Sequence, residues 1–167
     1  ARAMCHWHTK NKHCPSSGGY TISSNTGHTR KWQEKDSDTI KFPRTDPAVI
    51  VAITFENKIL LGRQVGWPRG MLSVLAGFVE PGETPEHAVA REIFEEAGVR
   101  AKNILYQYSQ PWPFPASLML GYTGKAESPD LTVNKDEIEM ASWFTREEIN
   151  KFGRYDFQLP RKLSISR

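Results

Sequence analysis

Apolar and polar positions alternate along much of the chain after residue 47 in a pattern that predicts β-strands. The run 48–55 is apolar and rich in β-branched residues, which predicts a strand buried on at least one face. A Glu-Asn turn separates it from a second strand over 58–63. Further strands are expected over 72–76, 103–109, 118–123 and 138–144.

Residues 85–97 carry a helical pattern instead. Val89, Ile93 and Ala97 form an apolar stripe that would face a sheet. Thr84 stands at the N-cap position and Gly98 at the position where helices commonly end. A capping box at 145–148 opens a second, short helix. Since strands and helices mix without strict alternation, we expect an α/β fold with a mixed sheet packed between helices.

The first 46 residues differ from the rest in pattern. Residues 1–13 predict a short helix, and 15–46 predict loops with short strands, because Ser, Thr, Gly and charged residues dominate there. We therefore expect a small segment over 1–46 and a main domain over 47–167. Charge divides at the same place: residues 1–46 hold 8 Lys and Arg against 4 Asp and Glu, and the remainder holds 14 against 15.

The composition excludes several classes of protein. A chain of 167 residues with 38% hydrophobic and 25% charged residues is typical of one globular domain, and no apolar run is long enough to span a membrane. Two Cys cannot form a disulfide framework, so we expect a reducing compartment. The sequence ends in Ile-Ser-Arg and not in the peroxisomal Ser-Lys-Leu, so we expect the cytoplasm, and we expect no membrane partner. The chain begins at Ala1 without Met or a signal peptide, and we expect a fragment of a longer protein.

Three carboxylates crowd one face of the predicted helix 85–97. Glu92, Glu95 and Glu96 have the spacing i, i+3, i+4, so they repel each other at neutral pH. A hard divalent cation such as Mg²⁺ or Mn²⁺ would reverse the sign of that interaction. The alternative is a solvated acidic face with Arg91 as a local partner.

The residues around these carboxylates complete a known motif. The run from Gly77 to Val99 reads GFVEPGETPEHAVAREIFEEAGV and resembles the Nudix box of hydrolases that act on nucleoside diphosphates linked to another moiety. Its fixed positions are matched by Gly77, Glu83, Arg91, Glu92, Ile93, Glu95, Glu96, Gly98 and Val99. The resemblance implies a Nudix fold and metal-dependent hydrolysis of a pyrophosphate.

The resemblance assigns a role to each of these residues. Glu92 and Glu96 ligate the metal cluster, and Glu95 is either a further ligand or the acceptor of the proton from water. The backbone carbonyl of Ala76 is implied as another ligand. Arg91 pairs with Glu83 and would pin the loop to the helix, while Gly77 allows a tight junction close to the metal.

A second segment indicates the subfamily. Residues 109–117 read SQPWPFPAS, a Pro-spaced loop that closely matches the motif of the NADH pyrophosphatase (NudC-type) subfamily. Gln110 is expected to bind the dinucleotide, Phe78 to stack on adenine and Ser166, near the end, to touch substrate. The remaining expected substrate residues are Pro111, Trp112, Pro113, Phe114, Pro115, Ala116 and Ser117.

The segment EIEMASW resembles the part of this subfamily that supplies one more metal ligand. We assign that role to Glu137, with Glu139 as the rival, because both fall on one face of a strand. A surface strand with acidic residues is the alternative for the whole segment.

The first residues resemble a zinc ribbon that has lost its zinc. Of the family's two Cys-x-x-Cys pairs only Cys14 is present, because Ser17 replaces its partner and the second pair, expected within 32–38, is absent. Cys5, His8, His13 and Cys14 form the one alternative ligand set, but a continuous helix would not bring them together. We therefore do not expect Zn²⁺ to bind.

The resemblance implies hydrolysis of NAD(H) to nicotinamide mononucleotide and AMP, with NAD-cap removal from RNA as related chemistry. The rival enzyme is a broader pyrophosphatase for ADP-ribose or other dinucleotides. A catalytically weak nucleotide- or RNA-binding module is the rival outside the enzymes. Relatives are commonly homodimers, which makes a homodimer the expected assembly.

Overall fold

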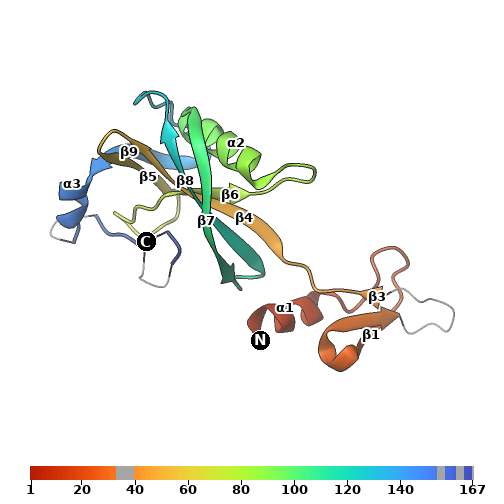
Figure 1. Ribbon diagram of the computed structural model, residues 1–167. Helices are drawn as coiled ribbons and strands as arrows, with labels where there is room; N and C mark the ends of the chain where they lie inside the picture. The colour runs from red at the N-terminus through yellow and green to blue at the C-terminus, as the bar shows by residue number, and fades with distance from the viewer. Residues whose placement is uncertain (33–39, 154–156, 161–163, 167) are drawn as a thin grey trace. The chain divides into compact units, whose positions relative to one another are not determined.

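The computed structural model describes residues 1–32, 40–153, 157–160 and 164–166. The chain divides into two compact units, each with its own fold (Figure 1). The first unit comprises 1–46 together with 111–118, and the second comprises 47–110 with 119–167. Within the described ranges, no helix has the length and apolar character needed to cross a membrane.

The first unit is a three-stranded antiparallel sheet with one helix. Its strands follow the order β1-β2-β3, and Ile22 pairs with Lys31, which in turn pairs with Ile40. The predicted first helix ends at Lys10, earlier than expected. The elements are α1 (Arg2–Lys10), β1 (Thr21–Ser24), the 3₁₀ turn η1 (Asn25–Gly27), β2 (Thr29–Trp32) and β3 (Ile40–Lys41).

A polar network joins α1 to the sheet of this unit. Trp7 is buried, and the neighbouring His8 contacts the Gly27 carbonyl through Nε2 at 2.8 Å and Arg30 through Nδ1 at 3.0 Å. Arg30 is itself buried and donates to both the hydroxyl and the carbonyl oxygen of Thr21. Since His8 is engaged with Arg30 and the helix stops at Lys10, the proposed set of Cys and His ligands is not gathered on one helix.

The second unit is built on a six-stranded sheet. Its path is β7-β8-β4-β5-β9, and β6 pairs with β4 off this path. The strands are β4 (Asp46–Phe55), β5 (Lys58–Gln64), β6 (Leu75–Phe78), β7 (Ala101–Trp112), β8 (Ser117–Ala126) and β9 (Ile138–Thr145). Two helices accompany them, α2 (Pro85–Ala97) and the short α3 (Arg146–Asn150), which confirms the predicted α/β fold (Figure 1).

Strand β4 has a different environment on each of its faces. Val49, Val51 and Ile53 belong to the core that also contains Val89 and Ile93 of α2. Alternation along a strand sends the residues between them to the opposite face of the sheet. The helix therefore covers one face of β4 and leaves the other face available for a pocket.

The caps of α2 are those that its sequence predicts. The Thr84 side chain accepts a hydrogen bond from the backbone of His87 at 3.3 Å, and Gly98 closes the helix with φ at 71°. The capping box between Thr145 and Glu148 that opens α3 is also present. Local chemistry therefore sets both ends of the helix that carries the glutamates.

Three sequence predictions need correction. The strand expected over 72–76 begins only at Leu75, and the 109–117 segment is mostly strand, with a turn limited to 113–116. Glu137 precedes β9, so Glu137 and Glu139 do not share a strand face. The segment searched for a second Cys pair falls largely outside the described residues.

Candidate active site

Arg91 of α2 contacts several residues of the motif at 77–99, both on the helix and before it. Its Nε and Nη2 donate to the two oxygens of Glu83, each at 2.9 Å. Its Nη1 donates to Glu92 and to Glu95, both at 3.0 Å, and Nη2 also reaches the Phe78 carbonyl at 2.9 Å. One guanidinium therefore joins the helix, the preceding loop and the end of β6.

The predicted pairing of Arg91 with Glu83 is confirmed, and it fixes the loop before α2. Hydrogen bonds from Arg91 lower the pKa of Glu83 and raise that of Arg91, so both stay charged at neutral pH. The second oxygen of Glu83 also accepts from the backbone N–H of Glu80 at 3.1 Å. This bidentate pair acts as a clamp between the loop and the helix.

Gly77 provides the space that Glu92 occupies. A methyl group on Gly77 would overlap the carboxylate of Glu92, so no other residue fits there without displacing that group. Gly77 pairs with Val49 in the sheet, which places it on the face that α2 covers. Burial raises the pKa of Glu92, although its contact with Arg91 opposes the change.

Glu96 is a buried carboxylate with one unsatisfied oxygen. The residue is 4% exposed, and its Oε2 has no hydrogen-bond partner. Burial, together with the charges of Glu92 and Glu137, raises the pKa of Glu96 to about 8. A buried acceptor without a donor is costly and is rare in folded proteins.

The structure distinguishes Glu137 from its rival Glu139. The charge of Glu137 acts on both Glu92 and Glu96, so it belongs to their cluster. Its side chain accepts from Asn134 at 3.1 Å, whereas Glu139 forms an ion pair with Arg63. Glu137 precedes β9 and Glu139 lies on it, so the two side chains have different surroundings, and the role of Glu137 as a metal ligand stays a prediction.

The glutamates of this site have the oxygen donors that a divalent cation takes, although their side chains do not converge on one point. Among the described residues, no three His, Cys, Asp or Glu side chains form a group that could hold a metal ion as it stands. Glu92 instead accepts a hydrogen bond from Arg91. Two features still favour a cation: the unpartnered oxygen of Glu96, and Gly77, which leaves room for the Glu92 carboxylate. Oxygen donors with excess negative charge are the donor set that Mg²⁺ and Mn²⁺ take. Ala76 precedes Gly77 on β6, beside this cluster in the chain.

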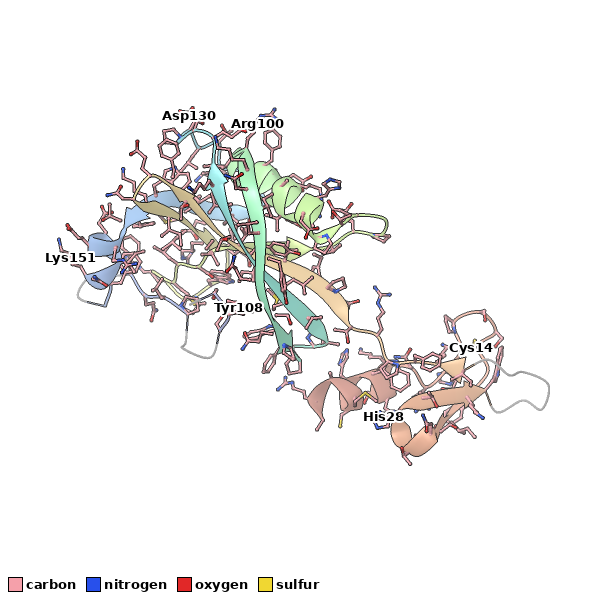
Figure 2. All side chains as sticks on the ribbon, viewed as in Figure 1. Cys14, His28, Arg100, Tyr108, Asp130 and Lys151 are labelled. Carbon is pink, nitrogen blue, oxygen red and sulfur yellow. The ribbon has the colours of Figure 1, made fainter. Side chains whose placement is uncertain are left out.

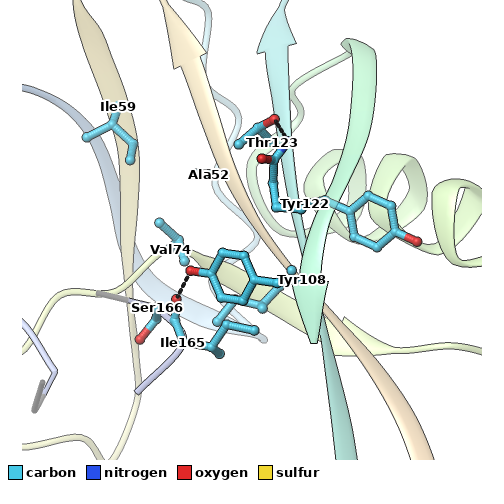
Figure 3. Close-up of a pocket in the computed structure, with 11 residues that line it drawn as sticks. Ala52, Ile59, Val74, Tyr108, Tyr122, Thr123, Ile165 and Ser166 are labelled. Atoms are coloured by element: carbon cyan, nitrogen blue, oxygen red, sulfur yellow. Dashed lines mark hydrogen bonds between the residues drawn. The ribbon is translucent and has the colours of Figure 1, made fainter. Parts of the chain in front are cut away.

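A pocket of about 170 Å³ lies on the face of β4 opposite α2 (Figure 3). Ile50 and Ala52 of β4, Tyr108 of β7 and the terminal residues Ile165 and Ser166 line it. Ala76 pairs with Ile50, whereas Gly77 pairs with Val49. Successive residues of β6 therefore point to opposite faces of the sheet, Ala76 toward the pocket and Gly77 toward the glutamates.

One predicted substrate residue, Ser166, lines this pocket, and another, Gln110, contacts the lining residue Ile165. The amide oxygen of Gln110 accepts from the backbone N–H of Ile165 at 2.8 Å, and the Ser166 hydroxyl is 2.7 Å from that of Ser164. Tyr108, which sequence analysis missed, donates to the Ile165 carbonyl at 3.4 Å (Figures 2 and 3). Its position two residues before Gln110 on one strand is the signal that could have found it.

The other predicted substrate residues have separate surroundings. Phe78 ends β6 with an exposed ring, 58% accessible. Residues 111–117 belong to the first unit, where the rings of Trp112 and Phe114 meet edge to face and the Arg2 guanidinium lies 4.5 Å from the Phe114 ring. The Ala116 carbonyl accepts from the Asp46 N–H at 2.9 Å. The tip of the β7–β8 hairpin is therefore an aromatic cluster within its own unit.

Comparison with known proteins decides the family. The model of the NUDIX domain matches residues 44–162. The chain belongs to the Nudix family. This result confirms the prediction drawn from the box at 77–99, and the match spans every glutamate described above.

Curated relatives of this Nudix chain are similar over most of its length. It is 43% identical to NAD-capped RNA hydrolase NUDT12 of Homo sapiens over 89% of the chain and 34% of that protein. It is 39% identical to NAD-capped RNA hydrolase NudC of Pseudomonas syringae over 96% of the chain and 55% of that protein. The chain thus spans about a third to just over half of these relatives. Their names agree with the predicted NADH pyrophosphatase-type resemblance.

Solved structures support the Nudix fold. The crystal structure of a NUDIX hydrolase from Nitrosomonas europaea matches with a TM-score of 0.66 at 24% identity, covering 88% of this chain and 84% of that one. A MutT NUDIX hydrolase from Burkholderia pseudomallei matches with a TM-score of 0.57 at 23% identity, over 73% and 92%. At these identities the likeness is one of fold.

Proposed function

We propose that this Nudix protein hydrolyses the pyrophosphate of NAD(H), giving nicotinamide mononucleotide and AMP, and removes NAD caps from RNA by the same reaction. The observation that carries the proposal is the buried, unpartnered oxygen of Glu96 beside Glu92 and Glu137. Relatives at about 40% identity with names of NAD-cap hydrolysis support the choice of substrate.

Glu92, Glu95, Glu96 and Glu137, with the Ala76 carbonyl, would hold Mg²⁺ or Mn²⁺. When bound, the cation neutralises the pyrophosphate and acidifies a water molecule. Glu95 is more exposed than Glu92 and Glu96, with its side chain 48% accessible, and this exposure supports a role for Glu95 as the acceptor of a proton from water. Glu95 accepts a hydrogen bond from Arg91, and it would have to release that contact before it accepts a proton.

The remaining residues hold and orient the reacting groups. The ion pair between Arg91 and Glu83 holds the loop before α2 against the helix, which keeps that loop in place beside the glutamates. The exposed Phe78 ring offers a surface on which a base can stack. The pocket lined by Ser166 lies on the face of the sheet opposite α2, so we assign to it no contact with the pyrophosphate that the glutamates would cleave. Water is the nucleophile, and no covalent enzyme intermediate is required.

A second substrate class, ADP-ribose and similar dinucleotides, would use the same glutamates. The pocket is small compared with a whole dinucleotide, so its volume does not distinguish NAD(H) from ADP-ribose. This makes the comparison of substrates the decisive test. The expected homodimer and cytoplasmic location belong to the same proposal.

The test compares NADH, NAD⁺, NAD-capped RNA and ADP-ribose at equal concentration with Mg²⁺ or Mn²⁺. We expect the NAD-containing substrates to give nicotinamide mononucleotide, identified by mass spectrometry, with kcat/KM at least tenfold above that for ADP-ribose. A preference for ADP-ribose would transfer the assignment to the broader pyrophosphatases. Nucleotide binding without any hydrolysis would indicate a binding module.

A further inference from the structure

The sheet of the first unit has one covered face and one open face. Thr21 and Arg30 are buried on the side where His8 and Trp7 of α1 pack. On the other side, alternation places Ile22 of β1 beside Lys31 of β2 and Ile40 of β3. These three form a row across all three strands, and the side chains of both isoleucines are more than 40% exposed.

Aromatic and imidazole rings extend this row. Tyr20 lies two positions before Ile22, is 50% exposed and contacts the ring of His13 edge to face at 5.5 Å. Phe42 follows two positions after Ile40 and is 69% exposed. The open face, which we call the ribbon face, consists of His13, Tyr20, Ile22, Lys31, Ile40 and Phe42.

The ribbon face is unusual for an exposed side of an antiparallel sheet. Such faces normally alternate to polar residues, and large apolar side chains gathered on one surface mark a binding site. Here four of the six residues are large and apolar, and the other two carry a cationic or imidazole group. The composition fits a ligand that has flat apolar faces and negative charge.

The described part of this unit carries a net positive charge. Residues 1–32 and 40–45 contain seven Lys and Arg, four His and no Asp or Glu. The acids of this segment are Glu34, Asp36 and Asp38, outside the described residues, and Asp46, which pairs with Arg44 at 2.7 Å. On the ribbon face itself Lys31 is the cationic side chain, and a second copy would set Lys31 and the same rings against themselves, which leaves its positive charge without a partner. A polyanion meets no such penalty.

We propose that the ribbon face binds single-stranded RNA without strong sequence preference. Bases stack on the rings of Tyr20 and Phe42, and Lys31 contacts a phosphate between them, in the way that aromatic and basic side chains share single strands elsewhere. The inference rests on the proposed function for its biological substrate, since it concerns the RNA that follows an NAD cap. Binding itself requires no hydrolysis.

The experiment measures binding of the full chain to a fluorescently labelled 20-nucleotide RNA with a 5′-monophosphate, by anisotropy. We expect Tyr20→Ala/Phe42→Ala to weaken binding about tenfold or more, and Tyr20→Phe/Phe42→Trp to restore it. Lys31→Ala should lower the slope of log K against log salt by about 0.7, as expected for one lost phosphate contact. Val65→Ala and Lys125→Ala, at exposed positions in the second unit, are the matched controls.

NADH hydrolysis is measured on every variant, and it should not change, which separates this proposal from that of the catalytic function. Circular dichroism checks that each variant is folded. RNA affinity equal to wild type in both the aromatic double variant and Lys31→Ala would overturn the inference. So would sedimentation showing that the double variant dissociates a dimer while RNA affinity is retained, because the ribbon face would then be an interface between copies.

Discussion

Glu96 shows most clearly what a single residue contributes to this site. Its carboxylate is buried, one oxygen has no partner, and neighbouring carboxylates repel its charge. The spacing of Glu92, Glu95 and Glu96 on a helix predicted that these groups would meet. Helix spacing could not predict the burial of Glu96, because it depends on how the segment before β9 packs against α2. Glu137 was expected near these groups only from the resemblance of its segment to a known family, not from a local pattern.

The raised pKa of Glu96 predicts how the stability of the metal-free chain depends on pH. Between its ordinary value near 4.5 and about 8, the folded chain binds a proton that the unfolded chain releases. The free energy of unfolding therefore falls as pH rises through that range. Thermal unfolding in EDTA from pH 5 to 8 should show the decline.

The Glu96→Gln variant serves as the control for this measurement. Its Tm should decline less between pH 5 and 8, and at pH 8 it should exceed that of the wild type without metal. Adding Mg²⁺ should stabilise the wild type and leave the variant nearly unchanged. Identical pH profiles for the two chains would show that Glu96 does not titrate in this range.

Gly77 gives a second prediction at the residue scale. Gly77→Ala would push the Glu92 carboxylate out of its place, because the added methyl group overlaps it. We expect kcat to fall by about 100-fold or more, which corresponds to roughly 3 kcal/mol of lost transition-state stabilisation. Steady-state NADH hydrolysis measures it. Gly82→Ala, in the loop after β6, introduces strain at φ 88° but nothing lies within 4 Å of the added group, so it is the control, and an equal loss of kcat there would argue against a specific effect on Glu92.

Helix α2 is the element that the sequence predicts best. Its stripe, its Thr84 cap and its Gly98 end all act within a few residues of the chain, so local physics decides them. Strand limits were predicted less well. Strand β6 begins at Leu75, which pairs with Val51 of β4, and β7 continues through Pro111 to Trp112. Pairing with another strand, which the pattern within one segment does not contain, sets both limits.

The end of α2 offers a prediction about stability. Gly98 has φ at 71°, and a methyl group on it would lie 2.7 Å from Cβ of Thr132. Gly98→Ala therefore adds a steric clash to the strain of a left-handed residue, and should destabilise the chain by about 2 kcal/mol. Urea denaturation measures the loss. Gly66→Ala has the same kind of strain at φ 90° in open space, so it should cost less, and an equal cost would show that the contact with Thr132 is unimportant.

At the scale of the whole molecule, the chain combines a Nudix unit with a small basic unit. The change in pattern near residue 47 predicted a boundary there, but not that 111–118 would group with the first unit, because that grouping joins segments far apart in the chain. The absence of the ribbon cysteines other than Cys14 could be predicted from the sequence. The sequence did not predict the network of His8, Arg30 and Thr21 that joins α1 to the sheet, because these residues are far apart in the chain.

The central claim is that the glutamates of α2 catalyse pyrophosphate hydrolysis. The most direct test is hydrolysis of NADH with Mg²⁺ or Mn²⁺ by the wild type, Glu96→Gln and the matched control Glu147→Gln, an exposed glutamate on α3. We predict that Glu96→Gln abolishes turnover while circular dichroism shows an intact fold, and that Glu147→Gln retains activity. Near-normal turnover by folded Glu96→Gln would contradict the account.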